Sequence, residues 1–214
     1  MFCNKNKISW EEHDKIRECV KPLMHEKRYI HTLGVEYESE RLAEIFEYKD
    51  MAKIKSAALL HDITKEFDRD KQLEICVRHK IKLNKSDMRV PKEWHAKTGA
   101  YIARHEFGAG DLIFKAIYYH TFGAPYKSFD LPSKILYLAD YIEPNRDYQD
   151  CVDVREYFYR NLNHADNLED KLKVLDGTIL FSLNKTLEVL IRENYFIHKN
   201  TVKCRNSFIV NLEK

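Results

Sequence analysis

The sequence predicts an all-α, single-domain protein, and three observations support this fold class. Apolar residues recur at helical spacing along most of the chain, and strand patterns are at most marginal. Glycine (6) and proline (5) are scarce among the 214 residues, which favours helices over turns. A chain of this length can bury one sizeable core, so one domain over residues 1–214 is the expected organisation.

Composition excludes several classes of protein. Lys and Arg (36) nearly balance Asp and Glu (34), which argues against nucleic-acid binding. No apolar run approaches the roughly 18 residues of a membrane helix, and the N-terminus lacks the apolar core of a signal peptide. The five cysteines are scattered singly, a pattern typical of reduced thiols in a cytosol. A cytoplasmic protein without membrane or nucleic-acid partners is therefore expected.

Start signals place the helices of the first half. Ser9 and Glu12 form a capping-box pattern, and Asp50 can cap the helix that contains the apolar run SAALLHD (56–62). That helix is expected to end in or just beyond His61 and Asp62. The helices predicted for this half are about residues 9–24, 26–48, 50–62 and 69–82, followed by a loop over 83–91.

The second half contains further helices of the same kind. Pro91 is expected near the start of a helix that ends near Gly108 or Gly110, and Asp111 can cap the helix that follows. The predicted helices are about residues 91–108, 111–120, 133–144, 152–162 and 168–194. The tail from residue 196 has no clear period.

Three apolar runs each present an ionisable side chain at or near their end. SAALLHD presents His61 and Asp62, FKAIYYH (114–120) presents His120, and KILYLAD (134–140) presents Asp140. A buried carboxylate without a partner is costly, so a cation, a hydrogen-bond network or a metal must compensate it.

Two more histidines join this set because each is followed by a glycine one helical turn later. Gly34 follows His31 and Gly99 follows His95. A glycine within a helix costs about 1 kcal/mol relative to alanine. The two glycines therefore indicate crowding on the helix faces that these histidines use.

The collected residues could bind two metal ions, the alternative being a hydrogen-bonded polar cluster. Imidazole and carboxylate ligands suit iron, manganese, zinc or cobalt, and the absence of cysteine ligands argues against a structural zinc site. Two neighbouring ions can share a carboxylate and a water molecule, and Asp62, adjacent to His61, is the expected bridge. The candidate ligands are His31, His61, Asp62, His95, His120 and Asp140.

Nearby cations indicate the kind of substrate. Lys65 shares a face with His61 and Asp62 if their helix continues, Arg28 precedes His31 by three residues, and Arg146 follows Asp140. Such cations would neutralise the charge that builds on phosphoryl oxygens, so they indicate a phosphate ester or anhydride. The other histidines, which are expected on the surface, are His13, His25, His79, His105, His164 and His198.

Five ordered segments carry a resemblance to a known family. They are RYIHTLGV (28–35), HDITK (61–65), WHAKTGA (94–100), YHTFG (119–123) and LADYIEPNR (138–146). Together they resemble the HD-domain phosphohydrolase superfamily and, within it, the YqeK-type family of symmetrical bis(5′-nucleosyl)-tetraphosphatases. The resemblance covers roughly residues 20–206. It implies a helical HD fold with a metal-site core over about 26–146 and C-terminal helical support over about 150–214.

The resemblance also implies an activity and its cofactors. Such enzymes cleave diadenosine tetraphosphate with water into two ADP at a di-iron centre, with manganese, zinc, cobalt or magnesium as alternative metals. The expected mechanism has a bridging hydroxide attack the β-phosphorus, with Asp62 and Lys65 as catalytic residues. Arg28, Lys65 and Arg146 are expected to bind the substrate. His31, His61, Asp62 and Asp140 would hold one ion, and Asp62, His95 and His120 the other.

Two alternatives stay open at this stage. The site could act on a nucleoside mono- or diphosphate or another phosphoester, because HD sites serve many phosphoesters. A nucleotide-binding module without catalysis is the other, although the complete ligand set argues against it. No heptad pattern indicates an interface, so the sequence leaves the oligomeric state open, with a homodimer as one arrangement.

Overall fold

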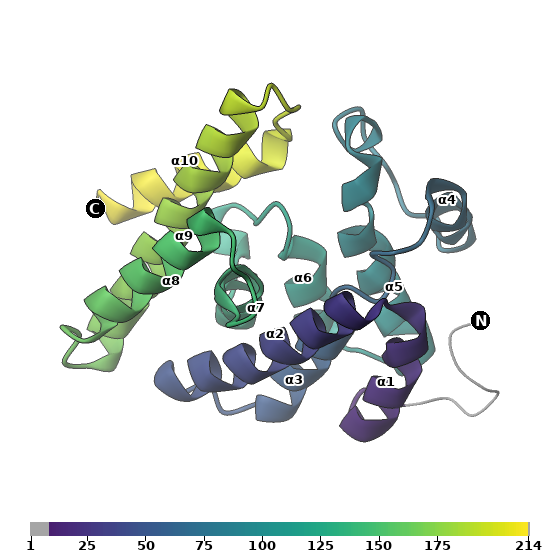
Figure 1. Cartoon of the computed structure of the whole chain (residues 1–214), viewed down its shortest axis with the longest axis horizontal. Coiled ribbons are helices and arrows are strands. Elements are labelled where there is room, and N and C mark those ends of the chain that lie inside the picture. Colours follow the sequence, from purple (N-terminus) through teal and green to yellow (C-terminus); the bar gives the residue numbers. More distant parts are fainter. Residues whose placement is uncertain (1–8, 214) are drawn as a thin grey trace.

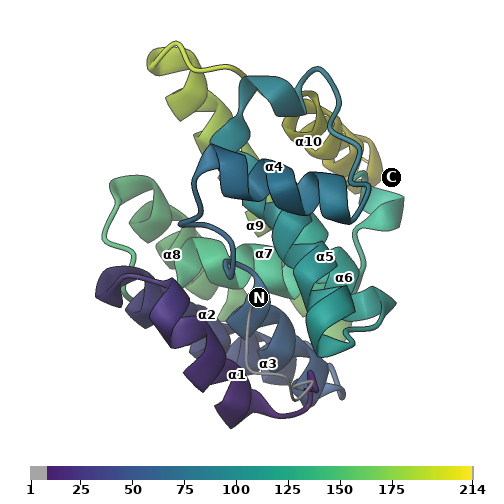
Figure 2. The ribbon, with the colours of Figure 1, turned by 90° about the vertical axis from the view of Figure 1, so that its right-hand side faces the viewer.

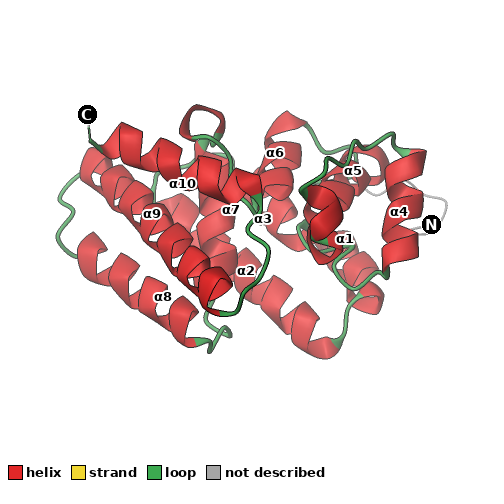
Figure 3. Ribbon diagram, turned by 90° about the horizontal axis from the view of Figure 1, so that it is seen from above, coloured by secondary structure: helices red, strands yellow, loops and turns green. Residues whose placement is uncertain are grey.

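The computed structural model describes residues 9–213, and all regular structure within that range is helical (Figures 1 and 3). The prediction of an all-α, single-domain protein is confirmed for this part of the chain. The α-helices are α1 (His13–Val20), α2 (Glu26–Ile45), α3 (Met51–Leu60), α4 (Arg69–Arg78), α5 (His95–Phe107), α6 (Asp111–Tyr119), α7 (Leu131–Ile142), α8 (Gln149–Leu162), α9 (Leu168–Arg192) and α10 (Lys199–Leu212). Short 3-10 helices are η1 (Lys21–Leu23), η2 (Asp87–Arg89), η3 (Pro91–Glu93) and η4 (Tyr126–Ser128).

Four helices form the centre of the molecule. α2 packs against α3 and α7, and α6 packs against α3, α5 and α7. Their apolar side chains, including Leu42, Leu60, Ile117 and Leu136, are fully buried. Each such side chain stabilises the fold by about 1.5–3 kcal/mol. This packing brings the ends of helices distant in sequence to one place.

The last three helices gather at one end of the molecule (Figure 3). α9 packs against both α8 and α10, and α7 contacts α8 and α9. Phe158 of α8 and Phe208 of α10 are fully buried. At the other end α4 lies on the outside of α5 (Figure 2). The division between a core and a C-terminal support stays a prediction.

The first helix is shorter than predicted. The Glu12 carboxylate accepts a hydrogen bond from the Ser9 backbone N–H at 2.9 Å, as in a capping box, but Glu12 itself is the N-cap. The α-helix ends at Val20, and the chain continues as η1, which contains Pro22. Proline has no N–H to donate to the preceding turn, so the α-helix does not extend to Met24.

Other boundaries also differ from the predictions. α3 ends at Leu60, one residue before His61, and α4 ends at Arg78 instead of reaching residue 82. Pro91 begins η3, while α5 begins at His95. Apolar spacing did not predict the C-terminal helix α10, although the family resemblance implied helical structure to about residue 214. Its buried face consists of Thr201, Cys204 and Phe208, and the first two of these do not stand out as apolar.

The cysteines only partly follow the expectation of reduced thiols. Cys76, Cys151 and Cys204 are free and buried, whereas Cys19 is disulfide-bonded.

Within residues 9–213, no helix combines the length and the apolar character that a membrane span requires.

Candidate metal centre

The six predicted ligands converge on one pocket of about 800 Å³. His31 comes from the first part of α2, and His61 and Asp62 directly follow α3. His95 begins α5, His120 directly follows α6, and Asp140 lies in the last turn of α7. Five of these side chains line the pocket, and His61 lies fully buried beside them.

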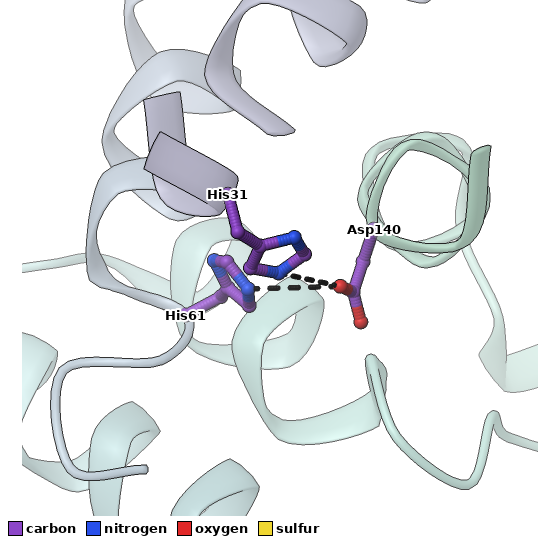
Figure 4. Close-up of side chains that lie close together, drawn as sticks. All are labelled: His31, His61 and Asp140. Carbon is purple, nitrogen blue, oxygen red and sulfur yellow. Dashed lines mark ion pairs between the residues drawn. The ribbon is translucent and has the colours of Figure 1, made fainter. Parts of the chain in front are cut away.

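The ligand atoms form two groups. The first contains His31, His61 and Asp140, and the second contains Asp62, His95 and His120, with all ligand atoms of a group within 4.8 Å of one another. Figure 4 shows the first group, in which Asp140 Oδ1 lies 3.1 Å from His31 Nε2 and 3.9 Å from His61 Nε2. In the second group His95 Nε2 and His120 Nε2 lie 3.1 Å apart.

Asp62 lies between the two groups and faces both. Its Oδ2 lies 3.4 Å from His61 Nε2 and 3.8 Å from His31 Nε2. Its Oδ1 lies 3.3 Å from His95 Nε2 and 3.8 Å from His120 Nε2. One carboxylate therefore offers a separate oxygen to each group, as a bridging ligand does.

The four imidazoles are oriented alike. In each, Nδ1 faces an oxygen acceptor at 2.6–3.0 Å, so Nδ1 carries the proton and Nε2 presents its lone pair to the pocket. For His61, His95 and His120 the acceptors are the backbone carbonyls of Ala58, Lys92 and Ile117, and for His31 the acceptor is the Glu143 carboxylate.

The Nε2 atoms argue against the alternative that the site is only a hydrogen-bonded polar cluster. His31 Nε2 and His61 Nε2 are buried and make no hydrogen bond that meets the geometric criteria, although Asp140 Oδ1 lies 3.1 Å from His31 Nε2. Burial lowers the pKa of His120 to about 4, and burial together with Lys65 holds the pKa of His95 well below its usual range. Two neutral rings that face each other through lone pairs fit a shared cation better than a hydrogen bond. The donor set therefore fits divalent metal ions.

Both carboxylates of the centre are ionised. Burial alone would raise the pKa of Asp62, but His61, His95 and Lys65 hold it well below its usual range. Burial likewise opposes ionisation of Asp140, and Arg146 and the neighbouring imidazoles hold its pKa well below the usual range. The centre thus concentrates negative charge where a cation would bind.

The three predicted substrate-binding cations line the same pocket. Arg28 Nη1 donates to Asp62 Oδ2 at 2.8 Å, and Arg146 Nη2 donates to Asp140 Oδ1 at 2.6 Å. Lys65 Nζ lies 3.3 Å from Glu93 Oε2 and 3.4 Å from the His95 ring nitrogens. Lys65 reaches the pocket from the turn after α3 and not from a continued helix, since its backbone N–H donates to the Asp62 carbonyl at 2.9 Å.

Both glycines mark close contacts, as predicted. A Cβ at Gly34 would lie 2.2 Å from Glu143 Oε2, and a Cβ at Gly99 would lie 3.2 Å from the His61 carbonyl oxygen. The crowding is confirmed, and its cause at Gly34 is a glutamate that sequence reasoning missed.

Other pocket residues were also missed. Thr121 Oγ1 lies 3.2 Å from His120 Nε2, and Thr186 of α9 and Tyr148 line the wall. A weak signal existed for two of the missed residues, because Glu143 follows Asp140 by three positions and Thr121 follows His120 directly.

The expectation of surface histidines is confirmed for His25, which is exposed at the edge of the pocket, and is wrong for His198. His198 is buried, stacks on Phe122 with ring centroids 4.0 Å apart, and has Nε2 3.3 Å from Asp87 Oδ1. His198 also caps α10, since its Nδ1 accepts from the Asn200 N–H at 3.2 Å.

Comparisons with known proteins agree with this geometry. The HD domain model matches residues 28–145. The chain is 37% identical over 172 residues to a symmetrical bis(5′-nucleosyl)-tetraphosphatase of Bacillus subtilis (strain 168), which covers 80% of this chain and 88% of that protein. It is 30% identical over 197 residues to a protein of the same description from Staphylococcus aureus (strain NCTC 8325 / PS 47), covering 91% and 93%.

A solved structure shows the same fold. It is the crystal structure of a "predicted HD superfamily hydrolase involved in NAD metabolism" from Clostridium acetobutylicum, with a TM-score of 0.81 and 32% sequence identity. The match covers 93% of this chain and 97% of that one. The chain therefore belongs to the HD domain family and, within it, to the family of symmetrical bis(5′-nucleosyl)-tetraphosphatases.

Proposed function

We propose that this protein is a metal-dependent hydrolase that cleaves dinucleoside tetraphosphates symmetrically, converting diadenosine tetraphosphate and water into two ADP. The family supports this activity, because the relatives above carry that name. The observation that carries the proposal is the position of Asp62, whose two oxygens face separate histidine groups. Phosphate anhydrides are hydrolysed at such paired metal sites.

The ligand groups define where the metal ions would be held. His31, His61, Asp140 and Asp62 Oδ2 would hold one ion, and Asp62 Oδ1, His95 and His120 the other. When bound, two divalent ions supply an acidified water as nucleophile and positive charge that stabilises the phosphoryl oxygens. Iron is the proposed native metal, with manganese, zinc, cobalt and magnesium as alternatives. Elemental analysis of protein purified without air would distinguish among them.

The cations of the pocket would bind the phosphate chain. Arg28 and Arg146 now pair with Asp62 and Asp140, and each guanidinium has further donors for phosphate oxygens. Lys65 lies beside His95 at the pocket wall. It is proposed to stabilise the charge that develops on the departing ADP and to donate a proton to it.

Product analysis tests this function. The metal-loaded protein is incubated with diadenosine tetraphosphate, and the nucleotides are separated by anion exchange. Two ADP per substrate are expected. ATP and AMP in equal amounts would contradict the symmetrical cut, and hydrolysis of nucleoside mono- or diphosphates alone would favour the broader phosphohydrolase alternative. Tight binding without turnover would indicate a nucleotide-binding module.

Location and assembly stay predictions. A cytoplasmic location follows from the sequence arguments above, and fractionation of the cells that make the protein would test it. An assembly of two copies would show as a doubled mass in sedimentation velocity.

A further inference from the structure

A buried glutamate lies behind one of the four histidines. Glu143 has no exposed surface, belongs to neither ligand group and directly follows α7. Its Oε1 accepts from His31 Nδ1 at 3.0 Å, the ring nitrogen opposite Nε2, which faces Asp140 and Asp62. Its Oε2 accepts from the Asn145 backbone N–H at 2.8 Å and from the Asn145 side chain at 2.9 Å. Both carboxylate oxygens are therefore engaged.

The surrounding chain is shaped to hold this carboxylate. Gly34 leaves the space that it occupies, because a Cβ there would lie 2.2 Å from Oε2. Arg155 of α8 holds the backbone around it, donating to the carbonyls of Ile142 at 2.7 Å, Glu143 at 2.5 Å and Arg146 at 2.8 Å. The space left by Gly34 of α2 and the backbone contacts of Arg155 of α8 thus keep the Glu143 carboxylate against His31.

The arrangement distinguishes His31 from the other histidines. The Nδ1 atoms of the other three donate to neutral backbone carbonyls, whereas His31 donates to a carboxylate. A carboxylate on Nδ1–H fixes the ring and makes Nε2 a stronger donor to a metal, and removing such a partner typically lowers metal affinity 10–100-fold. The two ligand groups should therefore differ in strength.

We propose that Glu143 is a positioning residue for His31 and makes the His31–His61–Asp140 group the tighter of two divalent-cation sites. The inference rests on the proposed function, since it takes the two groups as metal ligands. Glu143 would act through His31 alone and contact neither metal nor substrate.

The test titrates Mn²⁺ alone into the metal-free full-length protein and follows binding by calorimetry and by the EPR signal of free Mn²⁺. Two classes of site are expected. Glu143→Gln should weaken the tighter class 10–100-fold and leave the weaker class within about twofold. Gly34→Ala should shift the same class, because it displaces the carboxylate without changing the charge.

Control variants assign the classes. Asp140→Asn should remove the tighter class, and His120→Asn should remove the weaker. Glu38→Gln serves as the matched control, since Glu38 is another buried glutamate of the chain, pairs with Arg41 and Tyr159, and does not line the pocket. It should leave both classes unchanged.

Several outcomes would overturn the inference. They are two indistinguishable classes in the wild type, a tighter class that survives both Glu143→Gln and Gly34→Ala, an equal loss in both classes, or loss of the tighter class in His120→Asn. Far-UV circular dichroism of each metal-free variant checks folding. If Glu143→Gln does not fold, Gly34→Ala and Glu143→Asp decide, the latter because its shorter side chain cannot reach His31.

The proposed function can fail separately from this inference. Wild-type protein at saturating Mn²⁺ is assayed with diadenosine tetraphosphate in parallel. Absence of ADP with intact two-class binding would remove the proposed function and leave the role of Glu143 standing. If ADP forms but neither Glu143→Gln nor Gly34→Ala weakens the tighter class of site, the proposed function stands and the role of Glu143 is removed.

Discussion

Replacement of Asp62 by alanine is the most direct test of the bridging role. Among the described residues, Asp62 is the carboxylate that faces both ligand groups, with oxygens 3.3 Å from His95 Nε2 and 3.4 Å from His61 Nε2. The alanine variant would take one ligand oxygen from each group, because the Asp62 carboxylate is shared between the two. The charge stabilisation from metal ions amounts to several kcal/mol, and about 4 kcal/mol corresponds to roughly a 10³-fold fall in kcat.

The assay compares Asp62→Ala with Asp140→Ala. Asp140 belongs to the His31–His61 group alone, so its loss should remove about one metal per chain, whereas Asp62→Ala should weaken both sites. Metal content after gel filtration and the rate of ADP release are measured for both variants, with Glu38→Gln as the folded control. An Asp62→Ala protein that keeps two metals and turns over within tenfold of the wild type would refute the reasoning.

Four further outcomes are expected. Chelation should abolish ADP formation but leave the helical circular dichroism signal, because backbone carbonyls hold three of the four imidazole rings. Restoring Mn²⁺ at 100 times its Kd should then raise the free energy of unfolding by about 2.7 kcal/mol. An unchanged melting temperature would contradict metal binding. Arg146→Ala should lower kcat/KM by about 10–100-fold, since a hydrogen bond to a charged group contributes about 1.5–3 kcal/mol, and Arg146→Lys should recover only part; equal kinetics for wild type and alanine variant would place Arg146 outside the substrate site. Lys97→Met should destabilise the fold by about 3–5 kcal/mol in urea, because it leaves the buried Asp87 carboxylate, 2.6 Å from Lys97 Nζ, without its cation. Phe158→Ala should cost about 3–5 kcal/mol in the same experiment with ADP formation retained at low temperature, and a loss below 1 kcal/mol would contradict its place in the core.

Much of the fold was predictable because helix signals are local. Apolar spacing placed α2, α5, α6 and α9 within a few residues of their observed limits. The misses have local causes as well. Pro22 ends α1 early, and apolar spacing did not predict α10 because its buried face includes Thr201 and Cys204. His198 was expected on the surface because the sequence shows no partner for it, although Asp87 lies against it in the fold.

The identity of the candidate ligands was also predictable. An apolar run such as SAALLHD delivers an imidazole and a carboxylate to the protein interior, where they need compensation. The order of His31, His61, Asp62 and Asp140 then indicated the family before any geometry was known. These conclusions depend on residue type and spacing, which the sequence contains in full.

Only the tertiary structure decided how these residues are shared. It set Asp62 between two histidine groups and placed Glu143 against His31, 112 positions away in the chain. The direction of each Nε2 depends on which oxygen its Nδ1 meets, and for His31 that oxygen comes from another helix end. Such contacts follow from the packing of α2 against α7 and from the space left by Gly34, which spacing along one chain does not encode.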